Sequence, residues 1–184
     1  LKNEIEITFE YQLRKKNGDL LPAELHAKVF EYDGKPAIIN IARDLTERKR
    51  LEQELRENEE KFRSIFNSIN DPIFIHPHLK EGFGAFEDVN EAAAQKYGYT
   101  KPELLKMNAI DLAPSKKEFK LTDEEKRNEL IENKKVIEAI QVTKAGEKIP
   151  VEISLNKLMI NNRLMTVSVV RDITERKKAE EKLN

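Results

Sequence analysis

KAGEKIPVEI at residues 144–153 repeats KNGDLLPAEL at residues 16–25, and this repeat decides the fold. The two stretches share Gly, Pro and Glu at the same places, at an offset of 128 residues. The same offset places RDLTERKRLEQEL (43–55) on RDITERKKAEEKL (171–183) without a gap. A match of this length at one fixed offset indicates that the chain contains an internal duplication.

The first copy of the duplicated unit is incomplete. Residue 1 corresponds to Glu129, so the first copy has no counterpart of residues 60–128. We therefore expect one complete domain preceded by the tail of another, which fits a length of 184 residues. The predicted organisation is a three-strand tail of a truncated first domain at 1–43, a linker and signalling helix at 44–69, a complete domain at 70–172, and the start of a C-terminal signalling helix at 173–184.

Short apolar runs and turn residues predict the strands of the complete domain. A helical region at 90–134 is expected between them, because Asn90 is suited to cap a helix and Gly98 to end it. The sequence therefore predicts an α+β domain with antiparallel strands. The strands are expected at Pro72–His76, Phe86–Val89, Val136–Thr143, Ile149–Met159 and Leu164–Arg171.

Alternation along the later strands predicts which side chains share a face. One such face carries Ile149, Val151, Ile153 and Leu155, and a face of the next strand carries Met165, Val167 and Val169. For the strand at 136–143, the repeat leaves open which parity faces the core. The first copy has an equivalent apolar face without its covering helices, which we expect to pack against another chain or the complete domain. That face is predicted to contain Leu21, Leu25, Ile39 and Ile41.

The segment between the two copies has the spacing of a coiled-coil helix. Its apolar residues follow at intervals of four, seven, three and four residues as far as Ile69, and its other positions are almost all charged. We expect a parallel two-stranded coiled coil, and hence a homodimer whose register is fixed by an asparagine pair. The alternative is a single amphipathic helix that packs on its own domain. The predicted dimer seam is Leu51, Leu55, Asn58, Phe62 and Ile65.

Charge and composition exclude several classes of function. The 33 Lys and Arg residues nearly balance the 34 Asp and Glu residues, so no strong field favours nucleic acid as a partner. Cysteine is absent, which excludes disulfides and thiolate chemistry and fits a cytoplasmic location. No apolar run approaches the roughly 20 residues that cross a bilayer, although a parent protein could be attached to a membrane outside this sequence. No catalytic motif is recognisable, so the chain is not expected to be an enzyme.

Four motifs occur in the order typical of one sensory family. They are Asn90-Glu91-Ala92 after the second strand, Gly98-Tyr99 at a helix end, Glu103-Leu104, and Asp172-Ile173-Thr174 at the end of the last strand. With these motifs, residues 58–184 resemble a PAS domain with its C-terminal PAC segment. Residues 4–57 resemble the tail of another PAS domain.

The resemblance implies a PAS fold, in which a five-stranded antiparallel sheet of order 2-1-5-4-3 carries helices over one face and encloses a small cavity. It implies a sensory, signal-relay and dimerisation module of a signal-transduction protein, such as a two-component sensor histidine kinase, that acts on a downstream output domain. The alternative is a PAS interaction module of a transcription regulator or a diguanylate cyclase. The ligand-cavity candidates are Phe74, Tyr97, Leu112, Ile153, Val167 and Val169.

The residues argue against the coloured cofactors that some PAS domains carry. Flavin photosensors of the family form an adduct with a cysteine, and the chain has none. The common haem-binding members use a histidine on the helix before the third strand, and residues 90–140 contain no histidine. His76 and His78 are poorly spaced for a metal pair and are predicted to lie in an exposed loop. We expect no cofactor and no metal, and an apolar cavity that suits a small organic ligand or none.

The same short motif ends both copies. Asp172-Ile173-Thr174 and its copy Asp44-Leu45-Thr46 lie between a final strand and a charged helix. The resemblance places the signal-exit motif of the family at these residues. Asp172 and Thr174 both qualify as the helix cap, and the sequence leaves the choice between them open.

Overall fold

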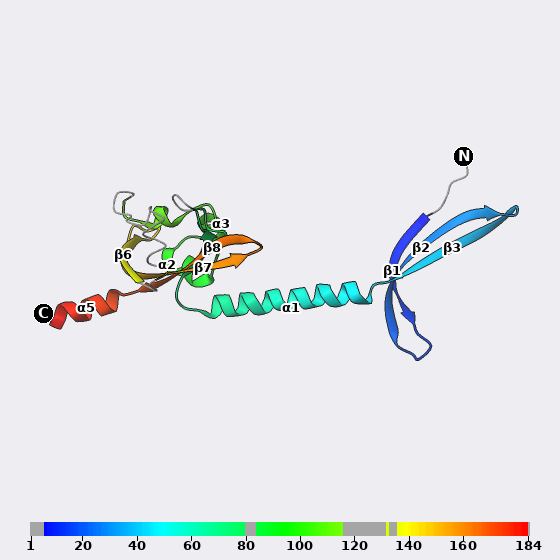
Figure 1. Cartoon of the computed structure of the whole chain (residues 1–184), viewed down its shortest axis with the longest axis horizontal. Helices are drawn as coiled ribbons and strands as arrows, with labels where there is room; N and C mark the ends of the chain where they lie inside the picture. The colour runs from blue at the N-terminus through cyan, green and yellow to red at the C-terminus, as the bar shows by residue number, and fades with distance from the viewer. Residues whose placement is uncertain (1–5, 80–83, 116–131, 133–135, 184) are drawn as a thin grey trace. The chain divides into compact units, whose positions relative to one another are not determined.

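The structure is a computed structural model of the chain (Figure 1). It describes all residues except 1–5, 80–83, 116–131, 133–135 and 184. The chain divides into two compact units, Leu1–Arg63 and Ser64–Asn184.

The first unit is built around a three-stranded antiparallel sheet of order β1-β2-β3. β1 (Glu6–Arg14), β2 (Leu20–Tyr32) and β3 (Lys35–Asp44) are the three antiparallel strands predicted for this part of the chain. Gly18 turns β1 into β2 with a φ of 95°, a left-handed conformation that glycine adopts without strain. Helix α1 (Thr46–Ser68) follows the sheet directly.

The predicted apolar face of this sheet is wrong in one respect. Ile41 lies opposite His26, which is the neighbour of Leu25 in β2. Residues opposite each other project from the same face, and neighbours along a strand project from opposite faces. Ile39 and Ile41 therefore project from one face of the sheet, and Leu21 and Leu25 from the other.

The second unit contains a five-stranded antiparallel sheet with the strand order β5-β4-β8-β7-β6. Counted within this unit, it is the predicted order 2-1-5-4-3. The last hairpin turns at Asn161 and Asn162, whose φ angles of 49° and 58° suit a tight hairpin turn. The strands are β4 (Ile73–Pro77), β5 (Asp88–Val89), β6 (Val136–Val142), β7 (Lys148–Ile160) and β8 (Arg163–Asp172).

Short helices follow β5. They are α2 (Glu91–Tyr97), α3 (Lys101–Leu104) and the 3-10 helix η1 (Ala109–Leu112). The Asn90 side chain caps α2, and Gly98 ends it in the left-handed conformation, as predicted. The predicted helical region continues to residue 134, and most of its last part lies outside the described residues. After β8 the chain forms α5 (Thr174–Leu183).

The hydrophobic core of the second unit lies between one face of the sheet and these short helices. Ile137, Ala139 and Gln141 on β6 face this core, because Ile137 lies opposite the core residue Ile153. The parity that the repeat left open is thereby determined, and Ile140 projects from the other face. The predicted common face of β7 is confirmed. The core cluster comprises Phe74, Phe86, Val89, Ala93, Tyr97, Leu104, Leu112, Ile149, Val151, Ile153, Leu155 and Val170.

Met165, Val167 and Val169 share one face of β8, as predicted, but the prediction that Val167 and Val169 line the cavity is wrong. Ser168 lies opposite the core residues Phe74 and Leu155, so Ser168 and Val170 face the core. Val167 and Val169 have the opposite parity and project from the outer face, by which we mean the face of this sheet that points away from the core cluster. Both valines are half-buried there, and neither contributes to the core.

Candidate functional site

Several of the predicted cavity residues meet in the core of the second unit. Phe74, Tyr97, Leu112 and Ile153 are all buried and belong to one cluster. The ring of Phe74 lies edge-on to the ring of Tyr97, with 5.6 Å between the centroids. The remaining two candidates, on β8, lie on the outer face and are separated from this cluster by the sheet. The core thus brings an aromatic residue of β4 against the end of α2.

Tyr97 carries a polar group into this apolar core. Its side chain is fully buried, and its hydroxyl donates a hydrogen bond to the Oε1 atom of Gln141 on β6. Burial raises the pKa of the Tyr97 hydroxyl, and the negative charge of Asp172 raises it further. The hydroxyl therefore stays protonated at neutral pH and connects α2 to the sheet.

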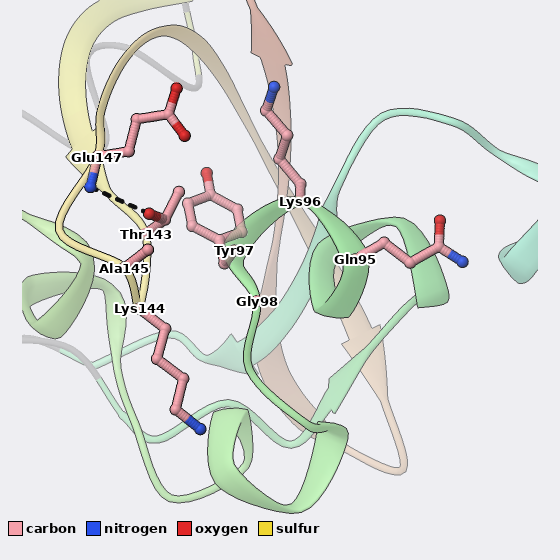
Figure 2. A pocket seen from close by; sticks show the side chains of 8 residues that line it. All are labelled: Gln95, Lys96, Tyr97, Gly98, Thr143, Lys144, Ala145 and Glu147. Carbon is pink, nitrogen blue, oxygen red and sulfur yellow. Dashed lines mark hydrogen bonds between the residues drawn. The ribbon is translucent and has the colours of Figure 1, made fainter.

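A pocket of about 390 Å³ opens beside Tyr97, between the end of α2 and the turn from β6 to β7 (Figure 2). The Lys144 N–H donates to the Tyr97 carbonyl over 2.9 Å, which attaches this turn to the helix end. Figure 2 shows Lys96 and Lys144 pointing away from each other, on the two sides of the Tyr97 backbone. The pocket is therefore lined by residues of α2 and of the turn, and Lys96 is one of the charged residues that line it.

Lys96 connects this pocket to the predicted signal-exit motif. Its Nζ atom forms an ion pair with the Oδ2 atom of Asp172, and the Oδ1 atom of Asp172 accepts a hydrogen bond of 2.8 Å from the Thr174 N–H. Burial acts to raise the pKa of Asp172, but hydrogen bonds from Lys96 and Thr174 outweigh it, and the pKa is lowered. Asp172 is thus charged at neutral pH. Its carboxylate caps α5, and Thr174 is the first helical residue.

The exit of the first copy has the same geometry. The Asp44 Oδ1 atom accepts a hydrogen bond of 2.7 Å from the Thr46 N–H. Leu45 is buried and its N–H donates to the Pro22 carbonyl over 2.9 Å. In the second copy, Ile173 is buried in the same way and its N–H donates to the Pro150 carbonyl over 3.0 Å. Each exit is therefore anchored by one buried apolar residue and one capping carboxylate.

The predicted dimer seam is exposed along α1. Its apolar side chains, Leu51, Leu55, Phe62 and Ile65, are 48% to 69% exposed, and Asn58 is also exposed. The one buried residue of α1 in the structure is Phe66, which is not part of the seam. The described residues of its own unit therefore leave each side chain of the seam exposed.

The prediction that His76 and His78 lie in an exposed loop is wrong for His76, while His78 follows β4 outside any strand but is half-buried. His76 belongs to β4 and is 3% exposed, and its Nε2 atom lies 3.1 Å from the Ser168 hydroxyl oxygen. The Nδ1 atom of His78 lies 2.9 Å from the Thr166 hydroxyl oxygen. The hydroxyls of β8 that face inward thus contact both imidazoles, which lets polar side chains occupy the core face at this end of the sheet.

Asn90 has a larger role than the helix cap that its sequence position predicts. Its buried side chain accepts hydrogen bonds from the N–H groups of Ile73 and Ala93, at 2.9 and 3.1 Å. It also donates to the carbonyls of Ile69 and Asp71, at 3.2 and 3.0 Å. One amide therefore connects the chain after α1, the start of β4 and the start of α2. The sequence alone did not show this role, because it does not reveal that Asn90 is buried between a strand and a helix.

The structure was also compared with the requirements of a metal site and of a membrane-spanning helix. In the part of the chain that the structure describes, no three His, Asp or Glu side chains gather as a metal site. No described helix combines the length and the apolar character that a membrane crossing needs.

The chain is similar to one curated protein named as a sensor and to one named as a kinase. Residues 1–47 and 70–175 match the family described as PAS domain. The methyl sulfide methyltransferase-associated sensor of Methanosarcina acetivorans is 38% identical over 127 residues, which are 68% of this chain and 12% of the relative. Sporulation kinase E of Bacillus subtilis is 27% identical over 161 residues, which are 85% of this chain and 21% of the relative. The chain thus spans a small part of the length of these curated relatives.

Solved structures share the fold of the second unit. A PAS domain of a two-component sensor histidine kinase has a TM-score of 0.52 and 25% identity, and the match covers 64% of this chain and 98% of that one. The PAS domain of an HTR-like protein from Haloarcula marismortui has a TM-score of 0.57 and 20% identity, with 68% and 99% covered. Both likenesses agree with the five-stranded sheet of the second unit.

Proposed function

Because the chain belongs to the PAS domain family, we propose that it is a sensory and signal-relay module that couples the state of its second unit to α5. The contact of Lys96 with Asp172 carries this proposal, since Lys96 lines the pocket beside α2 and Asp172 caps α5. A displacement of α2 would pull on the cap and change where α5 begins or how it is directed. The module itself is proposed to have no catalytic activity.

The parent protein is proposed to be a cytoplasmic sensor histidine kinase, whose output domain receives the signal from α5. Sporulation kinase E is a kinase by name, and one of the similar structures comes from a two-component sensor histidine kinase. The charge balance of the chain supports a protein or small-molecule partner over nucleic acid.

Dimerisation along α1 is the second part of the proposal. The exposed seam of Leu51, Leu55, Phe62 and Ile65 follows the heptad spacing, and most of the other positions of the helix are charged. Two chains that align these residues in parallel bury the seam of both, and Asn58 meets its symmetry mate. Such a helix pair holds two sensory units side by side, and signals pass along it as a change of packing.

The core of the second unit is the proposed place for a ligand. The apolar lining by Phe74, Tyr97, Leu112 and Ile153 suits a small organic molecule, or a core that stays filled by its own side chains. A cysteine-adduct flavin does not fit, because the chain has no cysteine. Haem bound in the helix-histidine mode does not fit either, because residues 90–140 contain no histidine.

Replacing Asp172 and Thr174 together by Ala tests the relay. The double substitution removes the cap of α5, which costs about 1 kcal/mol of stability, and leaves the core residues unchanged. We expect the longer protein that contains this chain to fold but to lose the link between its stimulus and its output. Output is compared with the thermal midpoint of the same preparation. A response that persists in a merely less stable protein would reduce the motif to a helix cap.

A module that only binds partners is the second candidate, as in a transcription regulator or a diguanylate cyclase. The exposed apolar side chains on the sheet of the first unit, Ile7, Phe9, Ile38 and Ile41 among them, favour it. We propose that this sheet is covered in the functional protein by another chain or by the complete domain. The two candidates differ in the effect of the exit-motif substitutions, which should leave pure partner binding unchanged.

A further inference from the structure

Two glutamates face each other on the outer face of the second unit. Glu138 on β6 lies directly opposite Glu152 on β7, and their neighbours Ile137 and Ile153 face the core. Like charges directly opposite each other destabilise a strand pair. The position therefore requires a positive partner, or it weakens the pairing of β6 with β7.

The positive partners come from the first turn of α5. Arg176 bridges both carboxylates, with its Nη1 atom 3.0 Å from Glu152 Oε2 and its Nη2 atom 2.5 Å from Glu138 Oε1. The Nζ atom of Lys177 lies 2.6 Å from Glu138 Oε2. The hydrogen bond from Lys177 lowers the pKa of Glu138, which keeps this carboxylate charged at neutral pH.

These charges determine how α5 is held on the sheet. No residue of α5 is buried, so beyond Ile173 at its start the helix has no apolar anchor. Single exposed ion pairs contribute little, but here an arginine and a lysine converge on two facing carboxylates. A contact of this kind weakens when salt shortens the screening length from about 10 Å at 0.1 M to about 3 Å at 1 M.

The first copy contains the same charged residues in a second arrangement. Glu10 lies opposite Glu24 on β1 and β2, and Lys49 binds Glu10 over 2.6 Å. Arg48, the counterpart of the bridging arginine, instead binds Glu52 on its own helix, over 2.8 Å. The repeat thus shows the arginine bound to the sheet in one copy and only to its own helix in the other, whereas the neighbouring lysine binds the strand glutamate in both copies.

We propose that Glu138, Glu152, Arg176 and Lys177 form an electrostatic latch that holds α5 on the outer face, and that the helix is released when Arg176 and Lys177 both exchange the sheet glutamates for Glu180, whose Oε2 atom lies 3.9 Å from Lys177 Nζ. Glu180 is the counterpart of the glutamate that holds the arginine in the first copy, and its Oε1 atom lies 3.8 Å from Arg176 Nε. Salt weakens the ion pairs that hold α5 on the sheet. The latch itself does not depend on the proposed function. Only its consequence, that α5 transmits a signal, rests on it.

The latch can be tested by a distance measurement in the whole chain. The chain has no cysteine, so Asn156→Cys on β7 and Lys182→Cys near the end of α5 provide two unique labelling sites, both exposed. Spin labels on these sites report the distance between α5 and the sheet by pulsed electron paramagnetic resonance. Excess unlabelled chain removes distances between partners of a dimer. Distance distributions are recorded at about 0.05 M and about 1 M salt.

We expect a narrow distribution at low salt and a broad one at high salt. Arg176→Gln with Lys177→Gln should give the broad distribution at both salt concentrations, with the ratio of docked to released helix lower by roughly threefold or more. Glu138→Gln with Glu152→Gln should have the same effect. Lys178→Gln is the matched control, because Lys178 binds Glu175 on its own helix and makes no contact with the sheet glutamates.

Two results would overturn the latch. One is a distribution in the unsubstituted chain that does not change with salt. The other is a control substitution that broadens the distribution as much as the substitutions at Arg176 and Lys177. If the distance distribution depends on salt but the substitutions at Arg176 and Lys177 leave signalling unchanged, the latch is supported and the relay role of α5 is contradicted. The two proposals can therefore fail separately.

Discussion

Replacing Leu55 and Phe62 by Asp should abolish the proposed α1 dimer and leave monomers. Both side chains lie on the exposed seam of α1 and are 69% and 48% exposed within the chain. In a parallel pair they would be buried against their symmetry mates, where a carboxylate without a partner is strongly unfavourable. We expect the dimer dissociation constant to rise at least about a hundredfold.

The same helix provides a matched control for this experiment. Gln53→Asp with Glu60→Asp places the same residue type at the same seven-residue spacing on the side of α1 farthest from the seam. These substitutions should leave the dimer intact. Sedimentation equilibrium over a range of concentrations measures both variants. An unsubstituted chain that stays monomeric at high concentration would contradict the seam, and α1 would then be a single helix.

Replacing Asn90 by Ala should cause a large loss of stability in the second unit. The Asn90 side chain is 1% exposed and is bonded to two N–H groups and to the carbonyls of Ile69 and Asp71. Its removal leaves several buried groups without a partner, each at about 1–3 kcal/mol. We expect the free energy of unfolding to fall by about 3 kcal/mol or more, and the thermal midpoint by roughly 10–20 °C.

Asn156→Ala is the control for the loss of an amide, since Asn156 is exposed on β7. It should change the free energy of unfolding by no more than about 0.5 kcal/mol. Urea denaturation followed by circular dichroism compares the two variants. A loss of less than about 1 kcal/mol for Asn90→Ala would mean that water replaces the amide, and the site would then not be a fixed connection between α1, β4 and α2.

The strands could be predicted from the sequence because they rest on local signals and on the repeat, whereas their order and the assignment of the exit motif came from the resemblance to PAS domains. The repeat placed the Asp44 and Asp172 motifs at equivalent positions, and the structure gives both the same hydrogen bonds. The choice of cap needed coordinates. Asp172 and Thr174 are both residue types that cap helices. The structure identifies Asp172 as the cap, because its carboxylate accepts the hydrogen bond from the first helical N–H.

The facing of β8 could not be predicted from alternation alone. The strand carries apolar residues at both parities, and the inward-facing positions before Val170 are Thr166 and Ser168. These hydroxyls are acceptable in the core because His76 and His78 lie within hydrogen-bonding distance of them. The same ambiguity misplaced Ile39 and Ile41 in the first copy. When a strand has apolar residues on both faces, its core-facing side chains are identified only from its register with a neighbouring strand whose core face is known.

The side chains that bind the exit motif and the start of α5 could not be predicted from sequence patterns. Lys96 and Asp172 are 76 positions apart in the chain and meet only when α2 packs beside the end of β8. The glutamates that hold Arg176 lie 24 and 38 positions before it. The repeat was the usable signal here, since each of these glutamates has a counterpart in the first copy at the common offset.

The coupling of α2 to α5 through Asp172 is tested most directly by amide hydrogen exchange in the chain that carries Lys96→Gln. Removing the lysine charge leaves the cap without its partner, and the N–H groups of the first turn of α5 should exchange roughly two- to fivefold faster. Amides of β4 and β8 should be unchanged, and Lys106→Gln, an exposed lysine after α3, should have no effect on α5. Exchange in α5 that is the same with and without the Lys96 charge would contradict the relay.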